Sequence, residues 1–344
     1  MNAGICGYPG SGKTTVFTAL APGARPQKGV SLGSIKVPDE RVDRLAALFH
    51  PRKTTYAELV FVDVPGEAGR GVGALHPQVV QAMRNSDLLV HVVRAFESPF
   101  HEAAPDPVRD IALFDDEIVL LDLAILEKRA ERWHKEARKG QEVDINDRCV
   151  ACLSDGRPLR SLELTEAELA TLTGIQLLSL KPLVILHNFS EAAWEDPASV
   201  PLRTWSRPAP STVQMGICGA LEAELAALPP EDQPEMLEGL GLSEPARTLF
   251  IRTTYELLDL ISFLTAGEDE CRAWPLPRGW NARRAAGRIH SDLERGFIRA
   301  EVYRLPDLEA AGSEAALKTQ GKIRVEGKDY VVQDGDVLHV RFAV

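Results

Sequence analysis

The sequence predicts an α/β protein in which a parallel sheet is interrupted by a helical arm and is followed by a small mixed β domain. Three observations support this prediction. Short, continuously apolar runs alternate with helical patterns in residues 1–105 and 180–262, as is typical of strands buried on both faces of a parallel sheet. A long helical pattern occupies residues 106–179 between them. From residue 263 onward, short alternating runs separated by turn residues indicate further strands.

The length and charge of the chain limit its class. A chain of 344 residues is long enough for two or three domains. Its 39 Lys and Arg residues against 50 Asp and Glu residues give a net charge of −11, which argues against broad non-specific binding of nucleic acid. The five scattered cysteines are typical of a reducing compartment. No apolar run reaches the roughly 18 residues of a membrane span, and no signal peptide is recognisable, so we expect a cytoplasmic protein with no membrane partner.

The first part of the chain contains three predicted strands, each an uninterrupted apolar run. They are NAGIC at 2–6, AELVFVDV at 57–64 and LLVHVVRAF at 88–96. Between the first two, Val42, Leu45 and Leu48 have the spacing of one helix face, which predicts a helix over residues 39–50.

The inserted arm is predicted to begin with a helix over residues 106–140. Pro107 suits the first turn of that helix, and Gly140 suits its end. The first half of the pattern is apolar and the second half is charged, so we expect a helix that is half buried and half projecting. A second helix is predicted over residues 165–180 and would return the chain to the sheet. It would begin at Thr165, with Glu168 as the partner in a capping box.

The remaining elements follow from the same patterns. Two more buried strands are predicted at 181–188 and 211–218, joined by a proline-rich irregular loop. The predicted helices that come next are 221–228, 235–242 and 248–264. The last part is predicted to contain strands within 270–276, 297–303 and 322–344, and one helix at 281–296.

The stretch GYPGSGKTT, residues 7–15, matches the phosphate-loop pattern G-x-x-x-x-G-K-[ST] between a predicted strand and a predicted helix. Its glycines allow several N–H groups to converge on phosphate oxygens at a helix N-terminus. Lys13 adds a positive charge for the β and γ oxygens, and the Thr14 hydroxyl can ligate Mg²⁺. The predicted nucleotide-binding residues of this loop are Gly7, Pro9, Gly10, Ser11, Gly12, Lys13, Thr14 and Thr15.

A D-x-x-G motif follows at the end of the second strand. Asp63 can hold Mg²⁺ through water, and the N–H of Gly66 is free for the γ-phosphate. Glu67 occupies the position at which many GTPases have a glutamine that orients water. A carboxylate there can orient or deprotonate water, but the γ-phosphate would also repel it, and an outward-turned Glu67 is the alternative.

The strand 181–188 ends in a motif that resembles a guanine-reading motif but differs from it. Asn-Lys-x-Asp would read guanine, because the Asp accepts from N1–H and N2–H₂; here the motif is Asn188-x-x-Glu191. An Asn amide can instead accept from adenine N6–H and donate to N7. We therefore predict ATP rather than GTP as the ligand, with Phe189 packing beside the base. A plain polar turn is the competing interpretation.

The order of these motifs is that of a Ras-like nucleotide domain with an inserted helical arm. The full chain resembles the YchF / Obg-like ATPase family of P-loop proteins. The similarity is strongest in VHVVRAFE (90–97), RSLELTEAE (160–168), AGEDECRAW (266–274), AAGRIHSDLERGFIRAEV (285–302) and KIRVEGKDYVVQDGDVLHVRF (322–342). The resemblance implies a P-loop domain at 1–105 and 180–262, a helical arm at 106–179, and a β-grasp domain of the TGS type at 263–344.

The resemblance also implies functional residues. Asn188 and Glu191 match the ATP-preferring base motif of the family, and His101 matches a loop histidine that assists hydrolysis. Backbone around the base would come from Cys218, Gly219 and Ala220. The family is associated with ribosomes and has low turnover, which implies a ribosome or ribosomal RNA as partner, through the arm and the TGS domain.

Several positions depart from the family pattern. Gly10 replaces the usual Asn, and Glu67 replaces a hydrophobic residue. Gln27 lies near the position of the family's switch threonine, where Ser31 is the only nearby hydroxyl. All three concern switching or hydrolysis, so nucleotide binding is predicted more firmly than turnover. Two alternatives to a slow ATPase therefore remain: a nucleotide-binding module with little hydrolysis, and a GTP-binding switch.

Overall fold

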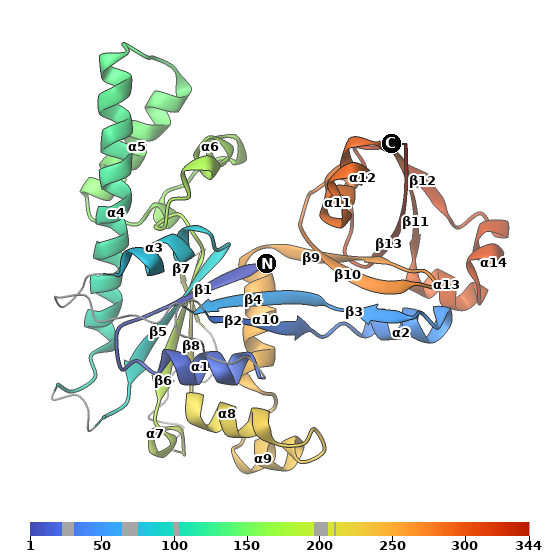
Figure 1. The fold of residues 1–344 in the computed structure, drawn as a ribbon, viewed down its shortest axis with the longest axis horizontal. Helices are drawn as coiled ribbons and strands as arrows, with labels where there is room; N and C mark the ends of the chain where they lie inside the picture. Colours follow the sequence, from blue (N-terminus) through green and yellow to red (C-terminus); the bar gives the residue numbers. More distant parts are fainter. Residues whose placement is uncertain (23–30, 64–74, 99–102, 196–205, 210, 344) are drawn as a thin grey trace. The chain divides into compact units, whose positions relative to one another are not determined.

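The computed structural model describes residues 1–22, 31–63, 75–98, 103–195, 206–209 and 211–343 (Figure 1). These residues form two compact units. Unit 1 comprises Met1–Ile35 and Val60–Leu257, and unit 2 comprises Lys36–Leu59 and Leu258–Val344. The predicted α/β class, with a P-loop sheet, a helical arm and a C-terminal β domain, is confirmed, whereas the three domain boundaries given above stay predictions.

The sheet of unit 1 is built from buried strands in the order β2-β4-β1-β5-β6-β8-β7 within the described chain. β1, β4, β5, β6 and β8 pair in parallel, and β7 is antiparallel at the edge. β1, β5 and β6 are buried on both faces over most of their length, as their continuous apolarity predicted. The strands are β1 (Asn2–Cys6), β2 (Ser31–Val37), β4 (Ala57–Asp63), β5 (Leu88–Ala95), β6 (Leu183–Phe189), β7 (Ser206–Ala209) and β8 (Thr212–Ile217).

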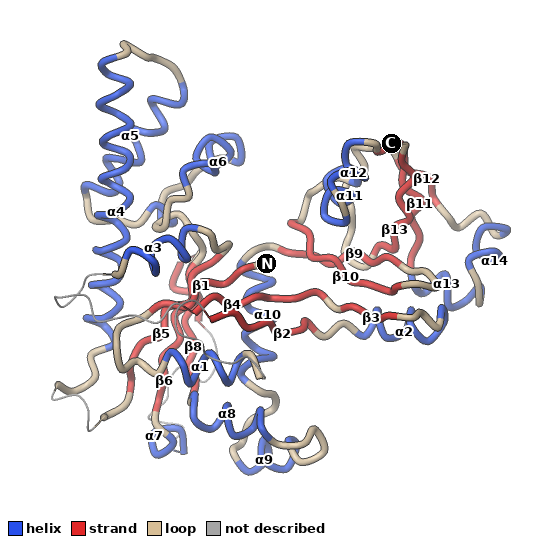
Figure 2. The backbone as a smooth tube through the Cα atoms, viewed as in Figure 1, coloured by secondary structure: helices blue, strands red, loops and turns tan. Residues whose placement is uncertain are grey.

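Helices cover this sheet, and others build the arm (Figure 2). The helices of unit 1 are α1 (Lys13–Leu20), α3 (Pro77–Arg84), α4 (Pro107–Lys135), α5 (Gln141–Ser154), α6 (Glu166–Leu172), α7 (Glu191–Glu195), α8 (Gly219–Ala227), α9 (Gln233–Gly239) and α10 (Ala246–Leu257). α7 and β7 lie where the sequence predicted only an irregular loop. Short helices and edge strands carry too few residues for a clear period, so their patterns are weak.

The arm consists of α4 and α5, which pack side by side (Figure 1). α4 begins at Pro107 as predicted, with the carboxylate of Asp106 accepting a hydrogen bond from the N–H of Arg109 at 3.0 Å. It ends at Lys135 rather than at Gly140, which instead precedes α5 with a φ of 125°. The patterns did not predict α5, because its buried positions include the polar residue Asn146. Although α4 has 29 residues, no helix in the described chain is long and apolar enough to cross a membrane.

The return from the arm is held by a buried carboxylate. Asp122 of α4 is fully buried and accepts hydrogen bonds from the N–H groups of Leu178 and Ser179 at 3.0 and 2.7 Å. The capping box between Thr165 and Glu168 is present as predicted. However, α6 ends at Leu172 instead of continuing to residue 180, since the chain turns out of the helix after it.

Unit 2 is a mixed sheet in the order β12-β11-β13-β9-β10-β3 among the described residues. Its strands are β3 (Lys53–Thr55), β9 (Leu260–Thr265), β10 (Glu270–Pro277), β11 (Phe297–Arg304), β12 (Arg324–Glu326) and β13 (Asp336–Phe342). Its helices are α2 (Glu40–Phe49), α11 (Ala282–Ile289), α12 (Ser291–Arg295), α13 (Leu305–Ala311) and α14 (Glu314–Thr319). The small side chains of α11 pack on the core face of the sheet, against Ile261, Phe263 and Leu338.

Two predicted helices in this region are corrected. The helix predicted over 248–264 ends at Leu257, and Leu260–Thr265 is strand β9. Asp259 between them has a φ of 46°, which breaks the helix, and Phe263 then pairs with Trp274 in an antiparallel ladder. The helix predicted over 281–296 is two helices separated at His290, whose backbone is extended.

Unit 2 is not a continuous stretch of chain. Residues 36–59 contribute α2 and β3 to it, and β3 pairs in parallel with β10 through the register Cys271 with Thr54. The guanidinium of Arg41 in α2 donates to the carboxylate of Asp334 at 2.8 Å. Helix α2 itself matches the prediction made for residues 39–50.

Candidate nucleotide-binding site

The predicted phosphate loop lies between β1 and α1. Its glycines have φ angles of 145° at Gly7, 78° at Gly10 and 85° at Gly12, in the region that favours glycine. A Cβ atom on Gly12 would lie 2.2 Å from Nδ2 of Asn188, and one on Gly7 would lie 2.4 Å from the carbonyl oxygen of Val92. The loop therefore lies directly against β5 and β6, and only glycine fits at these two points.

Lys13, the first residue of α1, folds its side chain back over the loop. Its Nζ donates to the carbonyl oxygens of Gly7 at 2.6 Å and Tyr8 at 3.3 Å. The first turn of α1 contains no acidic residue. The ammonium charge and the partial positive charge of the helix N-terminus therefore reinforce one another, which suits phosphate oxygens.

Asn188 connects the phosphate loop to the opposite side of the site. It ends β6, is only 5% exposed, and donates from Nδ2 to the carbonyl oxygen of Ser11 at 3.0 Å. Its Oδ1 accepts from the N–H of Gly219, at the start of α8, also at 3.0 Å. Nδ2 carries two hydrogens and Oδ1 has two lone pairs, and each of these bonds uses one of them. One hydrogen on Nδ2 and one lone pair on Oδ1 therefore remain for a ligand. The structure thus adds a bridging role to the base-reading role that the sequence predicted.

The predicted base-contact segment at the start of α8 is tightly packed. A Cβ atom on Gly219 would lie 3.1 Å from Val16 and 3.2 Å from Oδ1 of Asn188. Burial raises the pKa of the Cys218 thiol, while the N–H groups of Leu221 and Ala220 act in the opposite sense. Cys218 is therefore a neutral, buried group in this turn.

An apolar cluster lies next to Asn188. Trp194 and Cys218 are buried in it, and Phe189, Leu221 and Leu242 pack against them. The rings of Phe189 and Trp194 have centroids 6.4 Å apart. Sequence reasoning identified Phe189 but missed Trp194, for which the only local signal is its place three residues after Glu191.

Glu191 begins α7 and is exposed. The neighbouring Ser190 accepts a hydrogen bond from the N–H of Ala193 at 3.3 Å, which stabilises this first turn. The structure therefore places Glu191 at the rim of the apolar cluster rather than within it.

Most of the remaining residues of the phosphate loop are exposed to solvent. Pro9, Gly10, Thr14 and Thr15 are exposed, and Ser11 is buried. The Thr14 hydroxyl makes no hydrogen bond to another described residue, and its oxygen chemistry suits Mg²⁺. Asp63 ends β4 opposite Ile5 of β1, the strand that leads into the loop. Among the described residues, no group of three or more His, Cys, Asp or Glu side chains could hold a metal ion.

A buried aromatic contact beneath the loop was not predicted. His91 of β5 is fully buried, and neither ring nitrogen has a hydrogen-bond partner in the described chain. It stacks on Phe114 of α4 at 4.2 Å and meets the edge of Tyr8 at 6.1 Å. Burial lowers the pKa of His91 to about 3, so the ring is neutral and serves as packing between the phosphate loop and the base of the arm.

The predicted catalytic residues Gly66, Glu67 and His101 lie outside the described residues, as do Gln27 and the side chain of Asp63. Their roles stay predictions. One described contact bears on the segment that contains His101. Arg94 of β5 donates to the carbonyl oxygens of Phe96 at 3.4 Å and Ala103 at 2.8 Å, on either side of it.

Comparisons with known proteins agree with this architecture. The family model YchF-GTPase_C, described as "Protein of unknown function (DUF933)", matches residues 260–343. The chain is 36% identical to "Ribosome-binding ATPase YchF" of Bacillus subtilis (strain 168), over 100% of both chains. It is 32% identical to "Obg-like ATPase 1" of Oryza sativa subsp. japonica, over 100% of this chain and 92% of that protein.

Solved structures are similar as well. The Schizosaccharomyces pombe YchF GTPase superposes with a TM-score of 0.83 at 28% identity, over 99% of this chain and 97% of that one. A GTP binding protein from Pyrococcus horikoshii OT3 superposes with a TM-score of 0.62 at 19% identity over the full length of both chains, which supports the fold alone.

Proposed function

The chain belongs to the YchF family, and on that premise we propose that it binds ATP in preference to GTP at its phosphate loop, with Mg²⁺, and hydrolyses it slowly. The names of the relatives, ribosome-binding ATPases, support a role as a switch that associates with the ribosome. The observation that carries the base preference is the position of Asn188 between Ser11 and Gly219.

The free hydrogen-bonding capacities of Asn188 fit adenine better than guanine. Its remaining Nδ2 hydrogen can donate to N7, and its remaining Oδ1 lone pair can accept from N6–H of adenine. Guanine presents the O6 acceptor where adenine presents N6–H, so Oδ1 would face another acceptor. An unpaired polar contact of this kind in a buried site discriminates strongly. The apolar cluster around Phe189 and Trp194 would cover the base.

At the phosphate end, Lys13 and the N-terminus of α1 would hold the β- and γ-phosphates. Thr14 and Asp63 would hold Mg²⁺, directly or through water, and the metal would neutralise the charge that develops on the phosphates. The N–H of Gly66 would bind the γ-phosphate. His101 would position the attacking water, since a neutral imidazole can do so at pH 7.

A second candidate is a nucleotide-binding module that hydrolyses little or no ATP. The observation that favours it is Glu67, because a carboxylate next to the γ-phosphate is repelled by it. In this case ATP would only organise the arm and the C-terminal domain for a partner.

The proposed surfaces for the ribosome are the helical arm and the C-terminal domain. The last turn of α4 carries Arg132, His134 and Lys135. The guanidinium groups of Arg129 and Arg138 lie 4.0 and 4.7 Å from the centroid of the Trp133 ring. A basic end of this kind on an acidic chain suits ribosomal RNA.

The test is to measure affinities for ATP, GTP and ADP on one preparation, with Asn188→Ala and the exposed control Asn85→Ala. We expect ATP to bind at least about tenfold more tightly than GTP, and Asn188→Ala to remove most of this preference. A tenfold preference for GTP would contradict the base assignment. Phosphate release with and without ribosomes separates the two candidates, because the binding module releases little or none in either condition.

A further inference from the structure

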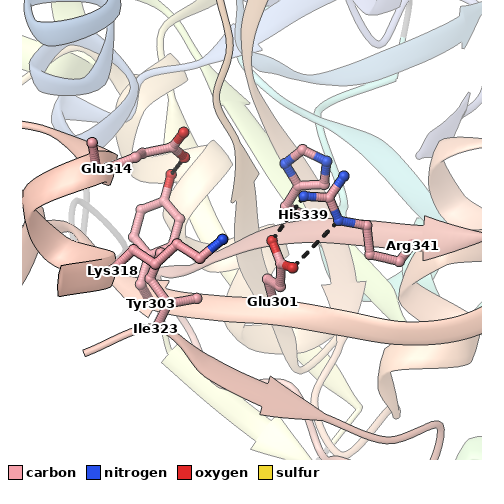
Figure 3. Close-up of a pocket in the computed structure, with 8 residues that line it drawn as sticks. Glu301, Tyr303, Glu314, Lys318, Ile323, His339 and Arg341 are labelled. Atoms are coloured by element: carbon pink, nitrogen blue, oxygen red, sulfur yellow. Dashed lines mark hydrogen bonds and ion pairs between the residues drawn. The ribbon is translucent and has the colours of Figure 1, made fainter. Parts of the chain in front are cut away.

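Unit 2 contains a small polar pocket that the nucleotide site does not use (Figure 3). Its volume is about 190 Å³. The pocket is lined by Glu301, Tyr303, Glu314, Ala315, Lys318, Ile323, His339 and Arg341, from β11, β13, α14 and the segment before β12. Five of these eight side chains carry or can carry charge.

The pairing of β11 with β13 explains why these side chains gather. Glu301 pairs with His339, so their side chains project from the same face of the sheet. The alternate residues Ala300 and Val302 project from the other face into the hydrophobic core. The pocket is therefore on the polar outer face of the sheet, and α14 forms a wall beside it.

The carboxylates in the pocket already have donors. Glu301 is paired with Arg341 at 3.1 Å and 3.4 Å, and the hydroxyl of Tyr303 donates to Glu314 at 2.5 Å. In Figure 3 the ammonium group of Lys318 extends between Tyr303 and Glu301. Neither it nor the ring of His339 makes a hydrogen bond or ion pair to another side chain of the described chain. The ammonium group of Lys318 and one ring N–H of His339 are thus donors without a side-chain partner in the described chain.

The pKa shifts of Glu301 and Tyr303 agree with these hydrogen bonds. The pKa of Glu301 is lowered, first by the hydrogen bond from Arg341 and also by the charges of His339 and Lys318. The pKa of Tyr303 is raised by burial and by Glu314, so its hydroxyl stays protonated and keeps Glu314 occupied. The cationic side chains around Glu301 therefore stabilise negative charge at that position.

We propose that this pocket binds a small anion of the phosphate class, held by Lys318, His339 and Arg341. A phosphate ion has several unprotonated acceptor oxygens, which match the N–H donors of Lys318 and Arg341. The pocket is smaller than the roughly 300–1,000 Å³ typical of sites for larger ligands. It therefore suits free phosphate or one compact phosphorylated group rather than a whole nucleotide.

The experiment is an NMR titration of full-length protein with inorganic phosphate at constant ionic strength. The readout is the ring-proton resonance of His339, assigned with a His339→Gln variant. We expect a saturable shift with a Kd of about 1 mM and a response at least about fivefold weaker with acetate. Repeating the titration with Lys13→Ala removes the phosphate-loop site, and the His339 response should persist. This readout is local to unit 2, so its result does not depend on ATP binding.

The decisive variant is Lys318→Met, which keeps the side-chain stem and removes the charge. It should weaken phosphate binding at least about fivefold, while the matched exposed control Lys328→Met should leave binding unchanged. Amide spectra of the remaining residues of unit 2 show whether each variant is folded. Equal binding by Lys318→Met and the native chain, equal responses to acetate and phosphate, or no saturable shift would each overturn the proposal.

Discussion

The two candidate sites of this protein are built from different parts of the polypeptide. In unit 1 the site depends on main-chain atoms: Lys13 donates to two carbonyl oxygens, and Asn188 joins a carbonyl group to an N–H group. In unit 2 the pocket depends on ionisable side chains from two strands and a helix. A site made from backbone needs glycine at fixed positions and leaves a motif in the sequence, whereas a side-chain pocket leaves none.

The largest effect should come from Gly12→Ala, which tests the backbone construction directly. Its Cβ would lie 2.2 Å from Nδ2 of Asn188, so the phosphate loop or the amide must move. We expect ATP affinity to fall at least about 100-fold, measured by calorimetry. The control is Gly156→Ala, which also has a positive φ, at 73°, but no atom within 4 Å of the added Cβ. Gly156→Ala should lose about 1 kcal/mol of unfolding free energy, and Gly12→Ala should lose more because of this clash. Equal ATP affinities of the two variants would contradict the prediction.

The next largest effect is the pH dependence of unit 1. Burial, and next the charges of His187 and Lys13, lower the pKa of His91 from 6.5 to about 3. The unfolded chain therefore binds a proton below pH 6.5 that the folded chain does not. The stabilisation is present above pH 6.5 and is lost as pH falls, by about 2 kcal/mol at pH 5. Hydrogen exchange resolved by peptide should show this loss in unit 1.

The control variants for this prediction are His91→Leu and His134→Leu. His91→Leu should reduce the pH dependence without abolishing it, because burial also lowers the pKa of His187, whereas the exposed His134→Leu should keep that of the native chain. Identical curves for all three proteins would show that His91 is not the group responsible.

A moderate effect is expected for Arg94→Met. Its guanidinium connects Phe96 and Ala103, which flank the segment with His101. Under the proposed function, we expect turnover to fall about tenfold with ATP affinity changed less than twofold, because the loop histidine loses its position. Steady-state kinetics with the exposed control Arg109→Met measure this. An equal loss of affinity would mean that Arg94 serves the structure of the whole site.

The smallest effect should be that of Arg341→Met on stability. The ion pair with Glu301 is partly exposed, at 49% and 23% of the two side chains, so solvent screens it. We expect less than about 1 kcal/mol loss of unfolding free energy by urea denaturation. A larger loss would show that the pocket of unit 2 is as integral to its fold as the phosphate loop is to unit 1.

Much of unit 1 could be predicted because its signals are local. The continuous apolar runs predicted β1, β4, β5 and β6, and glycine spacing predicted the phosphate loop. By contrast, the run at Leu260–Thr265 was assigned to a helix, because a short apolar run looks the same in either structure. Only its pairing with β10 makes it a strand.

The parts that could not be predicted depend on contacts between distant residues. Asn188 bridges Ser11 and Gly219, which lie 177 and 31 residues away along the chain. The pocket of unit 2 brings together Glu301 and His339 through strand register, which no local period reveals. The assignment of residues 36–59 to unit 2 depends in the same way on the pairing of β3 with β10.

The discontinuity of unit 2 has a consequence for synthesis of the chain. Residues 36–59 leave the ribosome about 200 residues before Leu258, which at 5–20 residues per second corresponds to about 10–40 s. During that interval β10 has not yet been synthesised, so β3 stays unpaired unless another protein, such as a chaperone, covers it. Conversely, a fragment that begins at Leu258 would expose the free edge of β10, and free edges promote aggregation. The two units therefore cannot be separated by a single cut in the gene.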